Sequence, residues 1–375
     1  MQTMEHIKTP GQLIEFLLNE RGWSQVLLSS ILGKDASTVS KLVTGKLDIS
    51  PELAVLLEEA FSLPAEKFLE VQQNFDLAKA RFAVTPDPRR TSRAKLLSDL
   101  PATEMIGRSW IKVGNTKDVF EIEAALGKFF GVEDNSGIEL ISYAAKKTNA
   151  LESINPLQLA WLYRVIAIAR QMMVKPFAKS KIPDLVAHLK PLLIAPQEAR
   201  KVPKLFAEYG IRLVFVEALK GSKIDGVCTW LDEKNPVIGL SLRHDRLDNF
   251  WFVLRHELEH VIQGHGLSAP HLDVEMEADA SSVIDSQEAQ ANEAAAYFSI
   301  PKGKIDSFIA RKAPIFQERD FLGFASLLGV HPSIAAGQIR HKTKRYELFN
   351  AHNAKIRDHV LPTAISDGWG TVAPF

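Results

Sequence analysis

The stretch RHELEHVIQGH, residues 255–265, holds the residues whose types and spacing most clearly predict chemistry. His256 and His260 are one helical turn apart, so on a helix both imidazoles lie on one face and can reach the same metal ion. Glu257 directly follows the first histidine, where its carboxylate can take a proton from water at that ion. The spacing therefore predicts a Zn²⁺ site with Glu257 as the catalytic base.

Two histidines leave such a site one protein ligand short, because catalytic zinc usually takes three and keeps the fourth position for water. Glu288, in the stretch QEAQANEAAAYFSIP, is the best candidate for the third ligand. Asn292 lies one turn later on the same helical face, where it can hydrogen-bond a ligand histidine. The rival carboxylates are Glu275, Glu277, Asp279 and Glu293. We do not expect His265 or His271 to bind the metal, because both follow the glycine that ends the helical pattern.

The surrounding residues predict a buried helix preceded by strands. Apolar residues recur at helical spacing between residues 249 and 262, and Asp248 can cap the start of this helix. The stretches 210–218, 226–232 and 236–242 are short, rich in β-branched residues and bounded by Gly, Asp or Asn. A small sheet followed by a helix is therefore expected to position the metal ligands.

The first 80 residues predict five short helices. Capping residues or prolines mark the helix starts at Thr9, Ser24, Asp35, Ser50 and Pro64. Helices this short are not stable alone, so they are expected to pack as one bundle.

The composition excludes some classes of protein but does not indicate a partner. The chain has 375 residues with 45 Lys+Arg and 45 Asp+Glu, so its net charge favours neither nucleic acid nor a membrane as a partner. No secretory signal and no run of about 18 apolar residues is present, so we expect a cytoplasmic protein without a membrane partner. The single cysteine, Cys228, excludes an internal disulfide framework and is expected to be a small buried side chain.

The stretches DNFWFVLRHELEHVIQGH and EAQANEAAAYFSIP together resemble the ImmA/IrrE zinc metallopeptidases, whose HExxH motif is followed by ExxA, then Asn or Asp, and an apolar run ending in proline. The matching positions are His256, Glu257, His260, Glu288, Ala291, Asn292 and Pro301. The resemblance covers residues 202–341 and implies a zincin-like α+β fold, a Zn²⁺ cofactor and a repressor-type protein as substrate. The chain departs from the family pattern at Ala294, where Phe is usual, and at Glu259, which we expect to face solvent.

The N-terminal stretch SQVLLSSILGKDASTVSKLVTGK, followed by SPELAVLLEEAF, resembles the Xre/Cro-type helix-turn-helix domains, particularly those of HigA-like antitoxins. The resemblance implies a lambda-repressor-like bundle in which the third helix buries Val39, Leu42 and Val43 and presents its other face to the major groove. The residues expected to meet DNA are Gln25, Ala36, Ser37, Thr38, Ser40, Lys41 and Lys46. Residues 1–80 contain seven Lys/Arg and eleven Asp/Glu, so a protein-docking bundle is the alternative.

These features predict a multidomain, mainly α protein with a small β-sheet. In chain order we expect a helix-turn-helix domain (1–82), a linker (83–95), a helical middle region (96–201), an ImmA/IrrE-like zinc metallopeptidase domain (202–310) and a C-terminal helical extension with an irregular tail (311–375).

The predicted function is that of a DNA-binding transcription regulator, acting on an operator as a homodimer, whose zinc endopeptidase domain cleaves a repressor-type protein. The alternative is an antitoxin-like regulator in which the zinc domain is a sensor or a structural support. A toxin partner bound by the N-terminal bundle is a third hypothesis, carried by the antitoxin resemblance alone.

Overall fold

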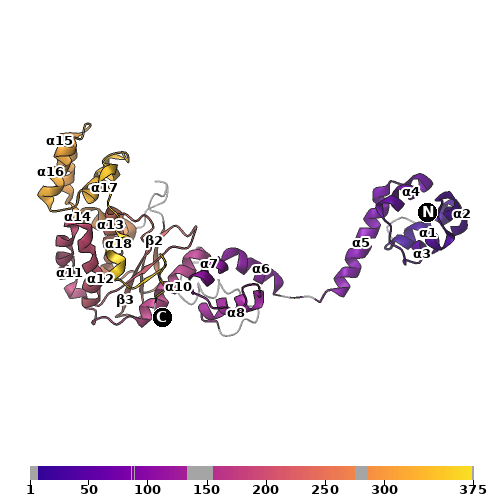
Figure 1. The fold of residues 1–375 in the computed structure, drawn as a ribbon, viewed down its shortest axis with the longest axis horizontal. Coiled ribbons are helices and arrows are strands. Elements are labelled where there is room, and N and C mark those ends of the chain that lie inside the picture. Colours follow the sequence, from indigo (N-terminus) through magenta and orange to yellow (C-terminus); the bar gives the residue numbers. More distant parts are fainter. Residues whose placement is uncertain (1–6, 86, 88, 133–154, 275–285, 374–375) are drawn as a thin grey trace. The chain divides into compact units, whose positions relative to one another are not determined.

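The computed structural model describes residues 7–85, 87, 89–132, 155–274 and 286–373 (Figure 1). The chain divides into two compact units, Met1–Pro88 and Arg89–Phe375. In the described part of the chain, no single helix has the length and apolar composition needed to cross a membrane. The helices Glu318–Leu328 and Pro332–Thr343 meet both criteria only when taken together, and the pair is bent by 113°.

The N-terminal unit is a bundle of short helices, as the capping pattern predicts. Its helices are α1 (Pro10–Arg21), α2 (Gln25–Ile31), α3 (Ala36–Val43), α4 (Pro51–Phe61) and α5 (Ala65–Ala83). Thr9 forms a capping box with Gln12 at the start of α1, and Ser24 and Ser50 accept hydrogen bonds from the first turns of α2 and α4. The core is formed by apolar side chains from all five helices, including Ile14, Leu28, Val39, Leu57 and Phe68.

The linker is shorter than the predicted 83–95. The next helix, α6 (Arg90–Asp99), includes residues that we expected to be exposed and irregular. Arg93 on α6 is largely buried, with its Nε 2.7 Å from Glu123 Oε2 on α8 (Val119–Phe129). A basic, proline-flanked stretch reads as a linker by local pattern, but a carboxylate distant in sequence holds this part in a helix.

The second unit contains a mixed sheet with the strand order β4-β2-β3-β1-β5. Its strands are β1 (Arg212–Val216), β2 (Ile224–Trp230), β3 (Pro236–Leu240), β4 (His271–Val274) and β5 (Ser366–Asp367). β1 is parallel to β3 and β5, whereas β2 is antiparallel to β3 and β4. The three strands predicted before the HExxH motif are therefore confirmed, and Cys228 on β2 is buried as expected.

Helices cover both faces of this sheet, and further helices extend away from it (Figure 1). Those before the HExxH motif also include α7 (Ala102–Gly107), α10 (Pro156–Gln171), α11 (Ile182–Leu189) and α12 (Val202–Glu208), with 3₁₀ turns at Lys179–Lys181, Lys190–Ile194 and Pro196–Lys201. Those from the motif onward are α13 (Leu247–Gln263), α14 (Ser286–Ser299), α15 (Lys302–Lys312), α16 (Glu318–Leu328), α17 (Pro332–Thr343) and α18 (Arg357–Val360), with 3₁₀ turns at Asn350–His352 and Leu361–Thr363.

The two faces of the sheet contribute to different apolar clusters. Along β1, Leu213 and Phe215 pack with residues of α13, whereas Val214 and Val216 pack with residues of α10. Trp161 on α10 also donates a hydrogen bond of 2.9 Å to the Val216 carbonyl. The predicted middle region therefore forms no separate body: α10, which is apolar on most sides, covers one face of the sheet.

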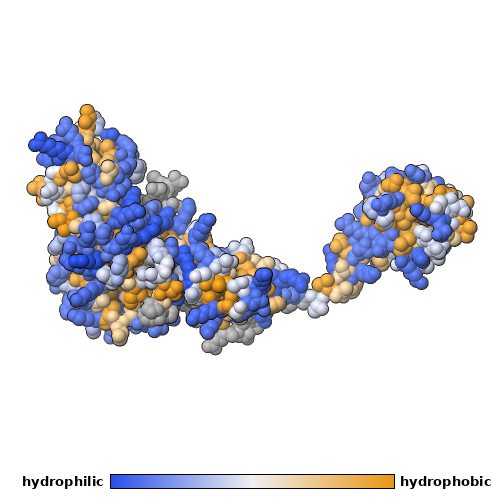
Figure 2. Space-filling model, in the orientation of Figure 1, coloured by the Kyte–Doolittle hydropathy of each residue, from blue (hydrophilic) through white to orange (hydrophobic). Residues whose placement is uncertain are grey.

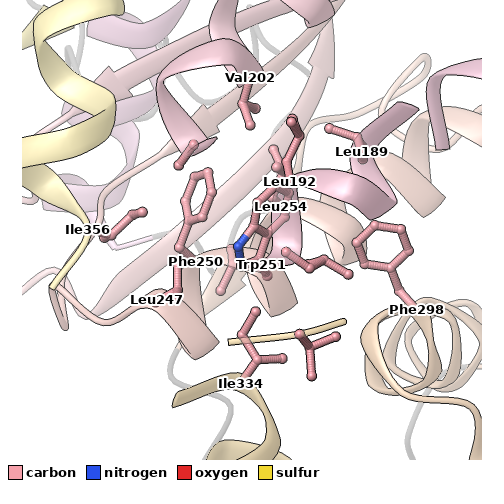
Figure 3. Close-up of a cluster of buried hydrophobic side chains, with 14 of the residues drawn as sticks. Leu189, Leu192, Val202, Leu247, Phe250, Trp251, Leu254, Phe298, Ile334 and Ile356 are labelled. Atoms are coloured by element: carbon pink, nitrogen blue, oxygen red, sulfur yellow. The ribbon is translucent and has the colours of Figure 1, made fainter. Parts of the chain in front are cut away.

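The cluster on the other face fixes α13 from several directions. Figure 3 shows Phe250, Trp251 and Leu254 of α13 among apolar side chains of other elements, which include Leu189, Val202, Phe298, Ile334 and Ile356. Full burial of one such side chain contributes about 1.5–3 kcal/mol. This apolar packing offsets part of the cost of holding polar groups on the same helix.

The C-terminal tail, predicted to be irregular, adds a strand to the sheet. β5 pairs with β1, and the carboxylate of Asp367 is fully buried. Arg164 on α10 forms an ion pair with Asp367, and Trp110 Nε1 donates a hydrogen bond of 3.1 Å to Asp367 Oδ1. A two-residue strand is too short to show a sequence pattern, and its position depends on these distant partners.

Candidate metal centre

Helix α13 places the residues of the HExxH motif inside the protein. His256, Glu257 and His260 are all fully buried. The Nε2 atoms of the two histidines lie 2.9 Å apart. The helix ends at Gly264, whose φ of 79° is a left-handed conformation that favours glycine.

Glu288 reaches the two histidines from the first turn of α14. Its Oε2 lies 3.4 Å from His256 Nε2 and its Oε1 lies 3.6 Å from His260 Nε2. Ligand atoms of all three residues lie within 4.8 Å of one another. Donors that share a tetrahedral zinc ion at bond lengths of about 2.0–2.2 Å are roughly 3.3–3.6 Å apart, so this set fits zinc after a slight separation of the two rings.

Among the described residues, the cluster includes none of the rival carboxylates. Glu293 is exposed on α14. The other three, Glu275, Glu277 and Asp279, lie outside the described residues.

The environment favours the protonation states that metal ligands need. Burial, followed by the charges of His271 and His256, lowers the pKa of His260 to about 3, so its ring is neutral near pH 7. Burial alone would raise the pKa of Glu288, but hydrogen bonds with His256 and His271 outweigh it and leave the pKa far below its usual value. A neutral imidazole and an ionised carboxylate can bind a cation without first losing a proton.

The carboxylate of Glu257 is accommodated by a glycine on the neighbouring strand. A Cβ atom added to Gly226 on β2 would lie 2.1 Å from Glu257 Oε1. Any larger residue at position 226 would displace this carboxylate or the strand. Sequence reasoning missed this role, although a glycine inside a strand pattern often marks such a close approach.

His265 and His271, which we did not expect at the metal site, both contact it. His265 Nδ1 and His260 Nδ1 lie 2.9 Å apart and can share a hydrogen bond. His271 Nε2 contacts Glu288 Oε1. The chain turns back at Gly264 and Gly266, and Trp230 Nε1 anchors the turn by donating a hydrogen bond of 2.8 Å to the His265 carbonyl. Because the chain turns back after α13, both histidines lie beside the cluster although they follow the end of the helix.

Asn292 lies one turn after Glu288 on α14, as predicted, but its Oδ1 does not hydrogen-bond a ligand histidine. Its Oδ1 is buried and accepts no hydrogen bond from the residues that the structure describes. The ring of His265 occupies the Nδ1 side of His260 instead. This contact leaves His260 Nε2 directed at His256 and Glu288.

Glu259 was predicted to face solvent, and this prediction is wrong. Its side chain is only 9% exposed and its Oε2 lies 2.7 Å from Arg255 NH2, one turn earlier on α13. Gln263 Nε2 donates a hydrogen bond of 2.7 Å to Glu259 Oε1. Partners on its own helix compensate this buried charge, so its departure from the family pattern does not break the helix.

In the N-terminal unit, α3 buries one face and exposes the other. Val39 and Leu42 are buried, and Thr38 is partly buried. The other residues expected to meet DNA are exposed: Gln25, Ala36, Ser37, Ser40, Lys41 and Lys46. Figure 2 shows apolar residues between the polar ones on the face of this unit that is in view, and Val26, Leu27 and Ile31 of α2 are among the exposed apolar side chains.

Comparison with known families matches two segments of the chain. Residues 14–68 match the helix-turn-helix family model, and residues 207–336 match the model of the IrrE N-terminal-like domain. A comparison with curated proteins gives no match. The second matched segment contains His256, Glu257, His260 and Glu288. The chain therefore joins an Xre-like helix-turn-helix domain to an ImmA/IrrE-type peptidase domain.

Proposed function

We propose that this protein is a DNA-binding transcription regulator whose second unit is a zinc-dependent endopeptidase that cleaves a repressor-type protein. The observation that carries the proposal is the convergence of His256, His260 and Glu288 on one point beside a buried glutamate. Two imidazoles and one carboxylate form the donor set of many hydrolytic zinc sites.

In this proposal His256, His260 and Glu288 hold the metal. Zinc held by these residues would supply Lewis-acid chemistry, which would make water and a peptide carbonyl more reactive. His265 holds the ring of His260 through its Nδ1 atom, which keeps Nε2 available as the donor.

Glu257 acts as the general base and then as the general acid. Its carboxylate takes a proton from the attacking water and passes that proton to the departing amine. Gly226 leaves space for this carboxylate, and the complete burial of Glu257 keeps bulk water away from it.

The N-terminal unit is proposed to bind an operator through α3 and the start of α2. The support is the exposed polar face of α3, with Lys41 and Lys46 available for phosphate contacts. Helix-turn-helix proteins often bind two half-sites as dimers, so we propose a homodimer on DNA. A peptidase carried by such a module acts close to DNA-bound repressors, which supports this substrate class.

The decisive test replaces Glu257 by Gln in the full-length, zinc-loaded protein. Repressor-type proteins are incubated with the wild type and with Glu257→Gln, and the products are identified by mass spectrometry. Glu257→Gln is expected to keep its zinc and lose at least about a hundredfold in cleavage rate, because only the proton acceptor is removed. Glu293→Gln, on the exposed face of α14, is the matched control and should cleave like the wild type. Equal cleavage by Glu257→Gln and the wild type would refute the assigned base.

A second candidate function is an antitoxin-like regulator in which the zinc domain is a sensor or a support. The contact of His271 with Glu288 favours it, because a fourth protein donor near the cluster is typical of non-catalytic zinc sites. A toxin is a candidate partner of the N-terminal bundle in that function. Zinc binding without cleavage of any repressor-type protein would favour this candidate.

A further inference from the structure

The sheet directs His271 toward the metal ligands. In the antiparallel pairing of β2 with β4, His271 lies opposite Cys228. Residues directly opposite each other have their side chains on the same face, and Cys228 packs into the apolar cluster that contains α13. Gly226, against which Glu257 packs, is two residues from Cys228 and lies on that face as well. The strand pairing thus fixes an imidazole on the side of the sheet where the HExxH helix lies.

The position of the His271 ring agrees with this direction. Its Nε2 contacts Glu288 Oε1, the oxygen that also lies 3.6 Å from His260 Nε2. The ring centroids of His260 and His271 are 3.9 Å apart. The His271 side chain is 24% exposed, so it lies at the solvent side of the fully buried histidines. A nitrogen donor therefore lies at the solvent side of the three-residue cluster and contacts its carboxylate.

His265 is close to the same cluster but has a different relation to it. Its Nδ1 lies 2.9 Å from the Nδ1 of His260, which is the ring nitrogen on the side away from Glu288 and His256. This contact lets His265 orient His260 through the ring nitrogen that faces away from the other donors. His265 therefore provides a matched comparison for His271.

We propose that His271 is a fourth protein ligand and that the resting metal centre is closed by three imidazoles and the Glu288 carboxylate. The inference rests on the zinc binding proposed above. A tetrahedral ion with four protein ligands has no position for water or substrate. Cleavage then requires His271 to leave the metal. The pairing of β4 with β2 positions His271, so a change in this pairing regulates the peptidase.

The test counts the histidines bound to zinc. X-ray absorption spectra of the full-length, zinc-loaded protein are recorded for the wild type, His271→Ala, His271→Gln and His265→Ala. Outer-shell scattering from imidazole should fit three histidines in the wild type and in His265→Ala. It should fit two in both variants of His271, with the missing ligand replaced by a light oxygen or nitrogen donor. Circular dichroism establishes that each variant is folded.

The outcomes separate this inference from the proposed function. A wild type with stoichiometric zinc and two histidines overturns the closed centre and leaves the three-ligand peptidase site intact. Identical spectra for the wild type and the His271 variants also overturn it, because His271 would then contact Glu288 without binding the metal. A wild type that takes up no zinc overturns both proposals.

Discussion

At the scale of single residues, the spacing within the HExxH motif predicted the two histidine ligands and the base. It did not predict which neighbouring residue leaves room for Glu257. His256 and His260 lie close together because four positions make one helical turn. Glu257 needs a gap in the neighbouring strand, and Gly226 supplies it. No local pattern around the motif could identify Gly226, since the contact forms only when β2 packs against α13.

Replacement of Gly226 by Ala tests this requirement. The added methyl would lie 2.1 Å from Glu257 Oε1, so we expect a loss of about 1–3 kcal/mol in the free energy of unfolding and displacement of this carboxylate, the proposed base. Repressor cleavage should fall more than zinc binding, because none of the three proposed metal ligands changes. Denaturant titration measures the free energy of unfolding, mass spectrometry of the products measures cleavage, and metal analysis measures the bound zinc.

Gly303→Ala on α15 is the matched control for that change. A Cβ at Gly303 meets nothing within 4 Å, and alanine favours a helix over glycine by about 0.5–1 kcal/mol. The control should therefore be as stable as the wild type or slightly more stable. If Gly226→Ala behaves like this control, Glu257 does not depend on the gap.

At the scale of elements, sequence periodicity predicted what local residues determine. The helix carrying His256 and the three strands before it have clear patterns, and the structure contains them. β4 and β5 were missed because four and two residues are too few to show a period. Arg93 and Glu259 were misjudged for a related reason, because each charge was read as exposed although it has a partly buried partner. Arg93 pairs with Glu123 on another helix, and Glu259 pairs with Arg255 one turn earlier on its own helix.

The cap of α17 predicts a dependence of stability on pH. His331 precedes this helix, and its Nδ1 accepts a hydrogen bond of 3.1 Å from the Ser333 amide. Burial, followed by the charge of His352, keeps the pKa of His331 below its usual 6.5. The unfolded chain gains a proton as the pH falls through about 6.5, while the folded protein stays neutral until a lower pH. Stability from this group is therefore present above about pH 6.5 and lost as the pH falls toward the folded pKa.

His331→Asn should reduce that loss, since Asn can cap the helix but does not titrate. Thermal unfolding of the metal-free protein at about pH 7 and about pH 5 measures the effect. The variant should lose less stability on acidification than the wild type does. A larger loss in the variant would mean that His331 does not contribute to acid sensitivity.

At the scale of the whole molecule, the second unit is one body built from distant parts of the chain. The predicted middle region covers the sheet through α10, and the last strand adds to the sheet beside β1. Arg164 and Asp367 join these parts through a buried ion pair. Composition and local pattern could not predict this union, because it depends on residues far apart in sequence.

Asp367→Asn tests how strongly this pair holds the unit together. The change leaves Arg164 as a buried charge without its counter-ion, which typically costs about 3–5 kcal/mol in the free energy of unfolding. Chemical denaturation of the second unit measures the loss. Glu347→Gln breaks the exposed pair with Arg345 and should change stability little. Equal stability of the two variants would show that the buried pair does not hold the C-terminal strand.

The zinc content of the full-length protein after exhaustive dialysis against a weak chelator decides whether the proposed metal centre exists. We expect one zinc ion per chain in the wild type and in Glu293→Ala. We expect loss of that ion when His256 and His260 are both replaced by Ala, because the two fully buried imidazoles of the cluster are then removed. Retention of zinc by this double variant at the wild-type level would contradict the proposed centre, since the metal would then be held somewhere other than at His256 and His260.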